Sequence, residues 1–198
     1  MLQPGLWMTG VGSAGMRWEG LFDDLAAQWD AEERRDRDAE VADRTRRDRA
    51  AVALLERLAA HRGARLGVRL RAGVSLEGEV SDLGRDWLLL RLDTGRREAL
   101  VPLAAVTALA GLPGRSGPVG SARRFGLGYA LRALSRDRAV VRVTDVAGRT
   151  TTGTIDAVGA DAVDLAEHPP EEPRRAANVR AVWTIPVAAL VVIESRAG

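Results

Sequence analysis

The chain of 198 residues contains no cysteine and no lysine, and only 4% of its residues are aromatic. Without cysteine, disulfide frameworks, thiolate zinc sites and cysteine nucleophiles are excluded. All 29 basic residues are arginine, whose planar fork suits contacts with phosphate. The longest uncharged run, residues 99–114, is shorter than the roughly 20 residues that span a bilayer. We therefore expect a soluble, cytoplasmic protein with a core of small aliphatic side chains.

Charge is unevenly placed along the chain. Residues 1–61 carry nine arginines and twelve acidic residues, whereas residues 62–198 carry twenty arginines and fifteen acidic residues. The second part is therefore mildly basic, well short of a histone-like tail. Residues 1–15 are rich in glycine and lack a basic segment followed by an apolar run, so they predict a disordered start and no secretory signal. Met1, Met8 and Met16 all remain candidates for the true start.

The N-terminal third has the pattern of a helix. Five apolar residues share one helical face, namely Trp18, Leu21, Phe22, Leu25 and Trp29. Residues 30–50 are mostly charged, with acidic residues placed four positions before arginines, a spacing that stabilises helices slightly. We expect one long charged helix over residues 16–62, of the coiled-coil kind. It is either a solvated rod or a rod that presents those five apolar side chains to a partner protein.

Two stretches of the remaining chain match each other. Residues 73–80 and 148–155 place glycines at equivalent positions, 75 residues apart, at Gly73 and Gly78 and again at Gly148 and Gly153. A second block matches at an offset of 84 around Pro102 and Pro186, so the second stretch contains nine additional residues. Matching glycine and proline positions imply matching backbone requirements. The sequence therefore predicts two tandem copies of one small β unit, with an inserted loop over residues 167–180 in the second.

Each copy predicts five short strands, because apolar and polar residues alternate between glycine-rich turns. The expected strands are 66–70, 74–80, 87–92, 98–101 and 106–109, then 140–144, 150–155, 162–166, 181–185 and 190–193. Residues 112–122, rich in glycine and proline, predict a linker, and residues 125–134 predict a second, shorter helix.

This arrangement resembles the Sm-like family of small β-barrels, and especially its bacterial RNA-chaperone branch, the Hfq proteins. The resemblance rests on Gly73, Gly78 and the apolar run that begins at Trp87, a pattern that returns at Gly148 and Gly153. It implies two tandem SH3-like, five-stranded barrels over residues 50–111 and 123–198, each preceded by a helix, in which the second glycine allows the bend that closes the barrel. The lysine–histidine pair of Hfq has no counterpart here. The segments around Pro102 and Pro186 also resemble PRC-type barrels.

No pattern in the sequence indicates an enzyme. His61 and His168 lack metal-ligand spacing to any other donor, so we expect helix capping or plain exposure for both. No serine has the surroundings of a catalytic nucleophile. We therefore expect no catalytic residue, no metal, no cofactor and no small-molecule substrate.

Two non-catalytic functions remain open. The first is binding of single-stranded RNA by arginines on the barrel surfaces, with Arg65, Arg69, Arg71, Arg85, Arg91, Arg96, Arg97, Arg142, Arg149, Arg174 and Arg175 as candidates. The second is a structural adaptor that self-associates through its barrels, as a homo-oligomer, and recruits another protein through the N-terminal helix. In both, Gly73, Gly78, Gly148, Gly153, Pro102 and Pro186 are expected to be structural.

Overall fold

The computed structural model describes residues 34, 35, 37, 53–92, 96–120 and 124–196. The chain divides into two compact units, Met1–Ala51 and Val52–Gly198. Only three residues of the first unit are described, so the fold below is that of the second unit. Among the described residues, no helix is both long and apolar enough to cross a membrane.

Ten strands form the second unit, and each lies within three residues of its predicted position. The first five are β1 (Arg65–Leu70), β2 (Ser75–Leu83), β3 (Trp87–Leu92), β4 (Arg97–Pro102) and β5 (Val106–Ala110). The second five are β6 (Val140–Asp145), β7 (Thr150–Val158), β8 (Ala162–Glu167), β9 (Ala181–Pro186) and β10 (Leu190–Arg196). We call β1–β5 the first half and β6–β10 the second half.

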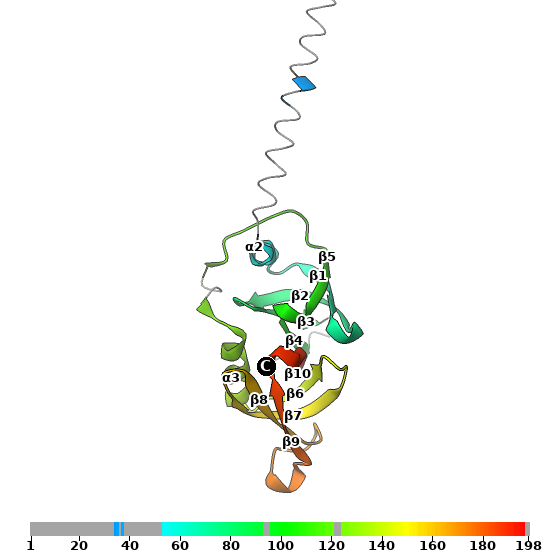
Figure 1. Cartoon of the computed structure of the whole chain (residues 1–198), viewed down its shortest axis with the longest axis vertical. Helices are drawn as coiled ribbons and strands as arrows, with labels where there is room; N and C mark the ends of the chain where they lie inside the picture. The colour runs from blue at the N-terminus through cyan, green and yellow to red at the C-terminus, as the bar shows by residue number, and fades with distance from the viewer. Residues whose placement is uncertain (1–33, 36, 38–52, 93–95, 121–123, 197–198) are drawn as a thin grey trace, which may run out of the picture. The chain divides into compact units, whose positions relative to one another are not determined.

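All ten strands belong to one open antiparallel sheet, in the order β5-β1-β2-β3-β4-β10-β6-β7-β8-β9 (Figure 1). The prediction of two tandem, separate five-stranded barrels is therefore wrong, and so is the small-barrel architecture taken from the Sm-like resemblance. The strand that joins the halves is β10, which pairs with β6 of its own half and with β4 of the first half. Because β4 is occupied by β10, it cannot close a first barrel against β5.

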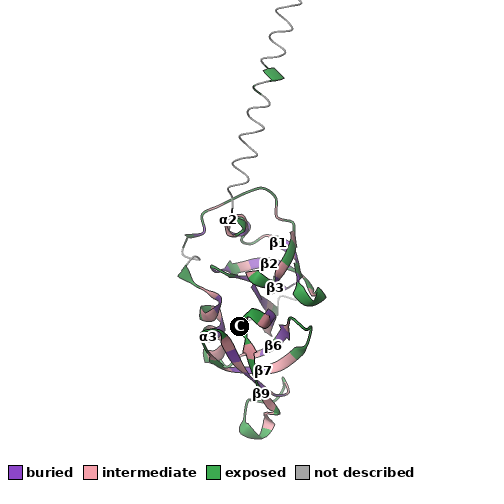
Figure 2. Ribbon diagram, viewed as in Figure 1, coloured by how far each residue is buried: buried purple, intermediate pink, exposed green. Residues whose placement is uncertain are grey.

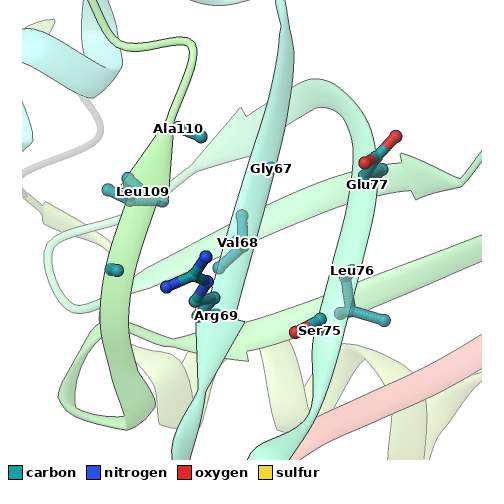
Figure 3. A pocket seen from close by; sticks show the side chains of 9 residues that line it. Gly67, Val68, Arg69, Ser75, Leu76, Glu77, Leu109 and Ala110 are labelled. Atoms are coloured by element: carbon teal, nitrogen blue, oxygen red, sulfur yellow. The ribbon is translucent and has the colours of Figure 1, made fainter.

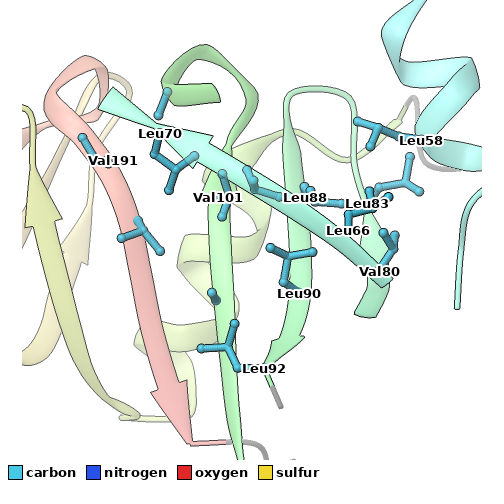
Figure 4. Close-up of a cluster of buried hydrophobic side chains, with 14 of the residues drawn as sticks. Leu58, Leu66, Leu70, Val80, Leu83, Leu88, Leu90, Leu92, Val101 and Val191 are labelled. Atoms are coloured by element: carbon cyan, nitrogen blue, oxygen red, sulfur yellow. The ribbon is translucent and has the colours of Figure 1, made fainter. Parts of the chain in front are cut away.

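Two hydrophobic clusters form the core, one for each half. The first is built around Leu66, Leu88 and Leu90 (Figure 4), and the second around Leu131 and Leu165. The purple, buried segments in Figure 2 follow the strands of both halves.

The strand β10 contributes to both clusters. Val191 and Val192 belong to the first, whereas Leu190 and Ile193 belong to the second, and all four are at most 2% exposed. Trp87, from the first half, packs in the second cluster. The halves therefore share core residues and are not independent.

The N-terminal helix was predicted to run without a break from residue 16 to residue 62, and this is wrong. In the described residues the helix that precedes β1 is α2 (Leu54–Ala59), of only six residues. Ala53 has an extended backbone (φ −69°, ψ 149°), and Glu56 Oε2 accepts its N–H at 3.3 Å, so α2 begins after Ala53. The expected coiled coil is thus not found in the described part of the chain, and residues 16–33, 36 and 38–52 lie outside it.

The segment that follows β5 packs along α2. Arg57 donates from Nη2 to the carbonyl oxygen of Leu112 at 2.6 Å, and the N–H of Gly117 donates to the carbonyl oxygen of Glu56 at 3.0 Å. The predicted linker is therefore held against the first half (Figure 1). The second helix, α3 (Leu127–Arg136), packs on β7 and buries Leu127 and Leu131 in the second cluster.

The two halves have the same strand registers. Gly78 lies opposite Leu66 and Leu92, and Gly153 lies opposite Val141 and Glu167. Two residues after these glycines the register shifts, in β2 between Val80 and Asp82 and in β7 between Ile155 and Ala157. Short 3-10 helices, η2 (Leu103–Ala105) and η5 (Val187–Ala189), follow Pro102 and Pro186. Positions 75 or 84 residues apart are therefore structurally equivalent.

Candidate interaction surface

Many of the predicted RNA-binding arginines lie next to carboxylates. Five of the eleven form ion pairs with neighbouring acidic residues: Arg65–Glu77, Arg85–Asp86, Arg91–Glu79, Arg97–Glu194 and Arg174–Asp156. Such exposed pairs contribute little stability, but each places a negative charge where a phosphate would have to bind. The hydrogen bond and the charge of Asp156 also raise the pKa of Arg174. Arg69, Arg71, Arg96, Arg142, Arg149 and Arg175 are exposed and come from both halves.

The aromatic residues of the sheet divide into one buried and one exposed tryptophan. Trp87 is 6% exposed, and its Nε1 donates to the carbonyl oxygen of Phe125 at 3.1 Å, so it is not available for stacking on a base. Trp183 in β9 is 48% exposed and donates to Glu167 Oε2 at 2.7 Å. Phe125 and Tyr129 are also exposed and pack on each other with ring centroids 4.6 Å apart.

The turn before Trp87 connects the first half to α3. Asp86 Oδ1 accepts the N–H of Leu127, the first residue of α3, at 2.6 Å, and the N–H of Arg85 donates to the carbonyl oxygen of Phe125 at 2.9 Å. Since Gly126, the N-cap residue, has no side chain to accept a hydrogen bond, Asp86 serves as the cap from a distant part of the sequence.

Replacing Asp86 by alanine should therefore destabilise the protein by about 1 kcal/mol, the usual effect of losing a helix cap. Asp86→Asn keeps an acceptor oxygen and should lose less. Urea unfolding of both variants measures the difference, and equal stability of wild type and Asp86→Ala would contradict the capping role.

The first free edge of the sheet is β9. Within the described residues, β9 pairs only with β8, and Val182 and Trp183 are 56% and 48% exposed. The N–H of Val187 donates back to the carbonyl oxygen of Asp161. Because N–H directions alternate along an antiparallel strand, the N–H groups of Val182 and Thr184 point away from β8. An exposed apolar edge with free donors is suited to pairing with another strand.

The second free edge is β5, which pairs only with β1 among the described strands. Beside it, the outer face has an open hollow of about 520 Å³ between β5, β1 and β2 (Figure 3). Gly67 and Ala110 form its floor, with the Ala110 Cβ at 3.4 Å from the position that a Gly67 Cβ would take. Arg69 and Glu77 stand at its sides (Figure 3). Small residues in a row therefore leave space beside this edge.

The junction between β4 and β10 shows how such edges meet inside the chain. The strands are antiparallel, with Leu100 opposite Ile193 and Ala99 opposite Glu194. By the offset of 84, β9 is the equivalent of β4, and β5 is the equivalent of β10. The two edges that stay free are thus the same two kinds of strand that pair at the junction.

Both histidines are buried and make hydrogen-bond contacts within the chain. Of the two expected alternatives, helix capping and plain exposure, plain exposure is wrong for both, since His61 is 6% and His168 2% exposed. His168 contacts Thr154 Oγ1 at 2.9 Å and the carbonyl oxygen of Pro169 at 2.8 Å, so it anchors the base of the inserted loop. His61 Nδ1 contacts the carbonyl oxygen of Arg57 at 2.6 Å. No cluster of three or more His, Asp or Glu residues in the described ranges could hold a metal ion.

The remaining predicted site residues take structural positions or lie outside the described residues. Gly73 and Gly148 have positive φ, +71° and +77°, at turns. The five apolar residues predicted to bind a partner (Trp18, Leu21, Phe22, Leu25 and Trp29) lie outside the described residues. No protein-family model and no curated protein matches the chain.

Sequence reasoning missed the two edges because alternation along a strand does not show which strands end the sheet. A comparison of the residues at equivalent positions of the two halves could have indicated the edges. Trp183 corresponds to Ala99 at an offset of 84, and Ala110 corresponds to Glu194 at the same offset. The large residue is therefore on β10 at the internal junction, but on β9 at the free edges.

Proposed function

We propose that this protein is a non-catalytic assembly protein that joins protein chains by strand pairing at the free edges of its sheet. The observation that carries the proposal is the β4–β10 junction, an edge-to-edge strand contact that the chain already makes internally. The equivalent strands β9 and β5 have no second partner in the described chain. The mode of binding is β-augmentation, in which backbone hydrogen bonds supply affinity and side-chain pockets supply specificity.

RNA binding by the eleven arginines is the weaker candidate. Five of them lie beside carboxylates. Trp87, which follows Arg85 by two residues, is buried. Non-specific recognition of single-stranded nucleic acid uses both a positive groove and exposed aromatic rings. The RNA function and the Sm-like family membership stay predictions.

The proposal is tested by measuring the mass of the full chain and its affinity for RNA. Sedimentation at rising protein concentration should show species larger than one chain. Titration with labelled single-stranded oligonucleotides should show no binding that falls steeply between about 50 and 200 mM salt, the behaviour expected of phosphate contacts. A chain that stays monomeric and binds RNA with such a salt dependence would replace the assembly proposal with the RNA one.

A further inference from the structure

The identity of the partner at the free edges can be argued from the residues on them. We propose that β9 of one chain pairs with β5 of a second copy of this chain, in the register of the β4–β10 junction, with Trp183 seated in the hollow over Gly67 and Ala110. This inference rests on the proposed assembly function and names its partner and its contact residues.

The register follows from the equivalent positions. At the junction Leu100 lies opposite Ile193, and the residues 84 positions from them are Thr184 and Leu109. Thr184 of one chain would therefore lie opposite Leu109 of the other, and Trp183 opposite Ala110.

The pairing of β5 supports the use of the junction register, because β5 pairs with β1 in the same way as β10 pairs with β6. Leu109 lies opposite Val68, as Ile193 lies opposite Val143. Ala110 lies opposite Gly67, as Glu194 lies opposite Arg142. Both strands also have a register shift near their start. A strand that can dock on β10 therefore finds the same backbone arrangement on β5.

Side-chain size supports the pairing of Trp183 with the hollow. Directly opposed residues of an antiparallel pair share one face of the sheet, so Trp183 would lie on the face of Ala110 and its neighbour Gly67. To enter the hollow, the indole turns away from Glu167 Oε2 of β8, to which its Nε1 donates within the chain. At the internal junction the small residue, Ala99, is on the β4 side, and the larger Glu194 and Arg142 are on the other side. At the free edges the large residue is on β9 and the small ones are beside β5. Both contacts therefore pair a small side chain with a large one, but the large side chain is on the opposite strand.

This exchange also makes the pairing selective. Trp183 would collide with a Glu194–Arg142 row, and Ala99 would leave the Gly67–Ala110 hollow empty. The edges of two chains therefore match each other better than they would match the internal junction strands.

The contact is heterologous, because it uses a different strand on each chain. Each chain has one β9 edge and one β5 edge, so binding one partner leaves another edge free. Such contacts continue until a ring closes or a filament grows.

The test uses the full chain and sedimentation over a range of concentrations. Ala110→Glu places a carboxylate in the hollow, and Trp183→Ala removes the side chain that fills it. Each should weaken self-association by about 30-fold or more, the loss typical of a central interface residue. Ala147→Glu adds the same charge at an exposed turn between β6 and β7, two inner strands of the sheet, and should leave self-association unchanged. Circular dichroism verifies that each variant is folded.

Two further variants test whether the sizes of residues 183 and 110 must match, or whether any change at the edges weakens association. The double variant Trp183→Ala with Ala110→Glu recreates the Ala99–Glu194 combination of the internal junction and should associate better than Ala110→Glu alone. Val182→Pro removes an outward N–H of β9 without removing a bond to β8. Mixed with Ala110→Glu chains, it should give only 1:1 dimers, since each partner then has one working edge of the opposite kind.

The results distinguish the two proposals. If the wild-type chain associates and Ala110→Glu and Trp183→Ala leave its mass unchanged, this seat for Trp183 is wrong while self-assembly stands. If the wild-type chain is monomeric at every concentration, the assembly function itself is wrong. A double variant no better than Ala110→Glu would contradict the size match.

Discussion

Removal of β10 by truncation after Ala189 should unfold both halves of the sheet. The strand contributes four aliphatic side chains that are at most 2% exposed, two in each hydrophobic cluster. At about 1.5 kcal/mol or more for each buried aliphatic side chain, the loss is at least about 6 kcal/mol. That is comparable with the whole stability of a typical domain, about 5–15 kcal/mol. Far-ultraviolet circular dichroism of the truncated chain should show loss of the β signal.

Hydrogen exchange gives the sharper measurement of the same truncation. If the halves were separate barrels, amides of β1–β3 would stay protected after β10 is removed. We expect their protection to be lost, because Val191 and Val192 complete the first cluster. A matched control is truncation after Arg196, which removes only two residues and leaves β10 whole. Persistent protection of β1–β3 in the shorter chain would contradict the shared core.

Replacement of Gly153 by alanine should destabilise the protein by about 3 kcal/mol, the upper part of the usual range for overpacking a well-packed site. Gly153 is buried in β7, and a Cβ there would overlap the carbonyl oxygen of Ala166 in the neighbouring strand. The neighbour is backbone and cannot rotate away, so β7 and β8 would have to separate. Urea unfolding measures the effect as a shift of the midpoint at unchanged slope.

A glycine series provides the controls for this prediction. At Gly78, the equivalent position in the first half, the added Cβ would lie 2.6 Å from the carbonyl oxygen of Arg91, so Gly78→Ala should cost less than Gly153→Ala. Gly114 has no atom within 4 Å of the added Cβ, and Gly114→Ala should be close to neutral. An equal effect at Gly153 and Gly114 would contradict the close approach of the strands.

The strand positions could be predicted because their causes are local. Alternating residues such as Leu66, Val68 and Leu70 specify one buried face of a strand, and Gly73 with φ +71° specifies a turn that other residues adopt at a cost. The extended backbone at Ala53 had no such signal, because alanine favours helices. There the chain follows the packing of α2 against the first half.

The candidate site was less accessible to sequence reasoning. The arginines were chosen by type and position along the strands, and sequence alone did not show that Glu77, Glu79 and Glu194 would lie beside three of them. Trp183 lies opposite the buried Leu165, but its strand ends the sheet and leaves it half exposed. Burial of a strand face depends on which elements lie next to it, and those come from distant parts of the chain.

The sequence by itself determined the ten strands, the glycines at the turns and close approaches, and the correspondence between residues 75 or 84 positions apart. Only the tertiary structure decided that β4 pairs with β10, so that ten strands form one open sheet with β5 and β9 at its ends. The physical reason is that side-chain alternation specifies which face of a strand is buried, whereas the backbone hydrogen bonds along its edges are alike for every residue. The choice among possible neighbours is made by the whole core, through shared residues such as Val192 and Ile193.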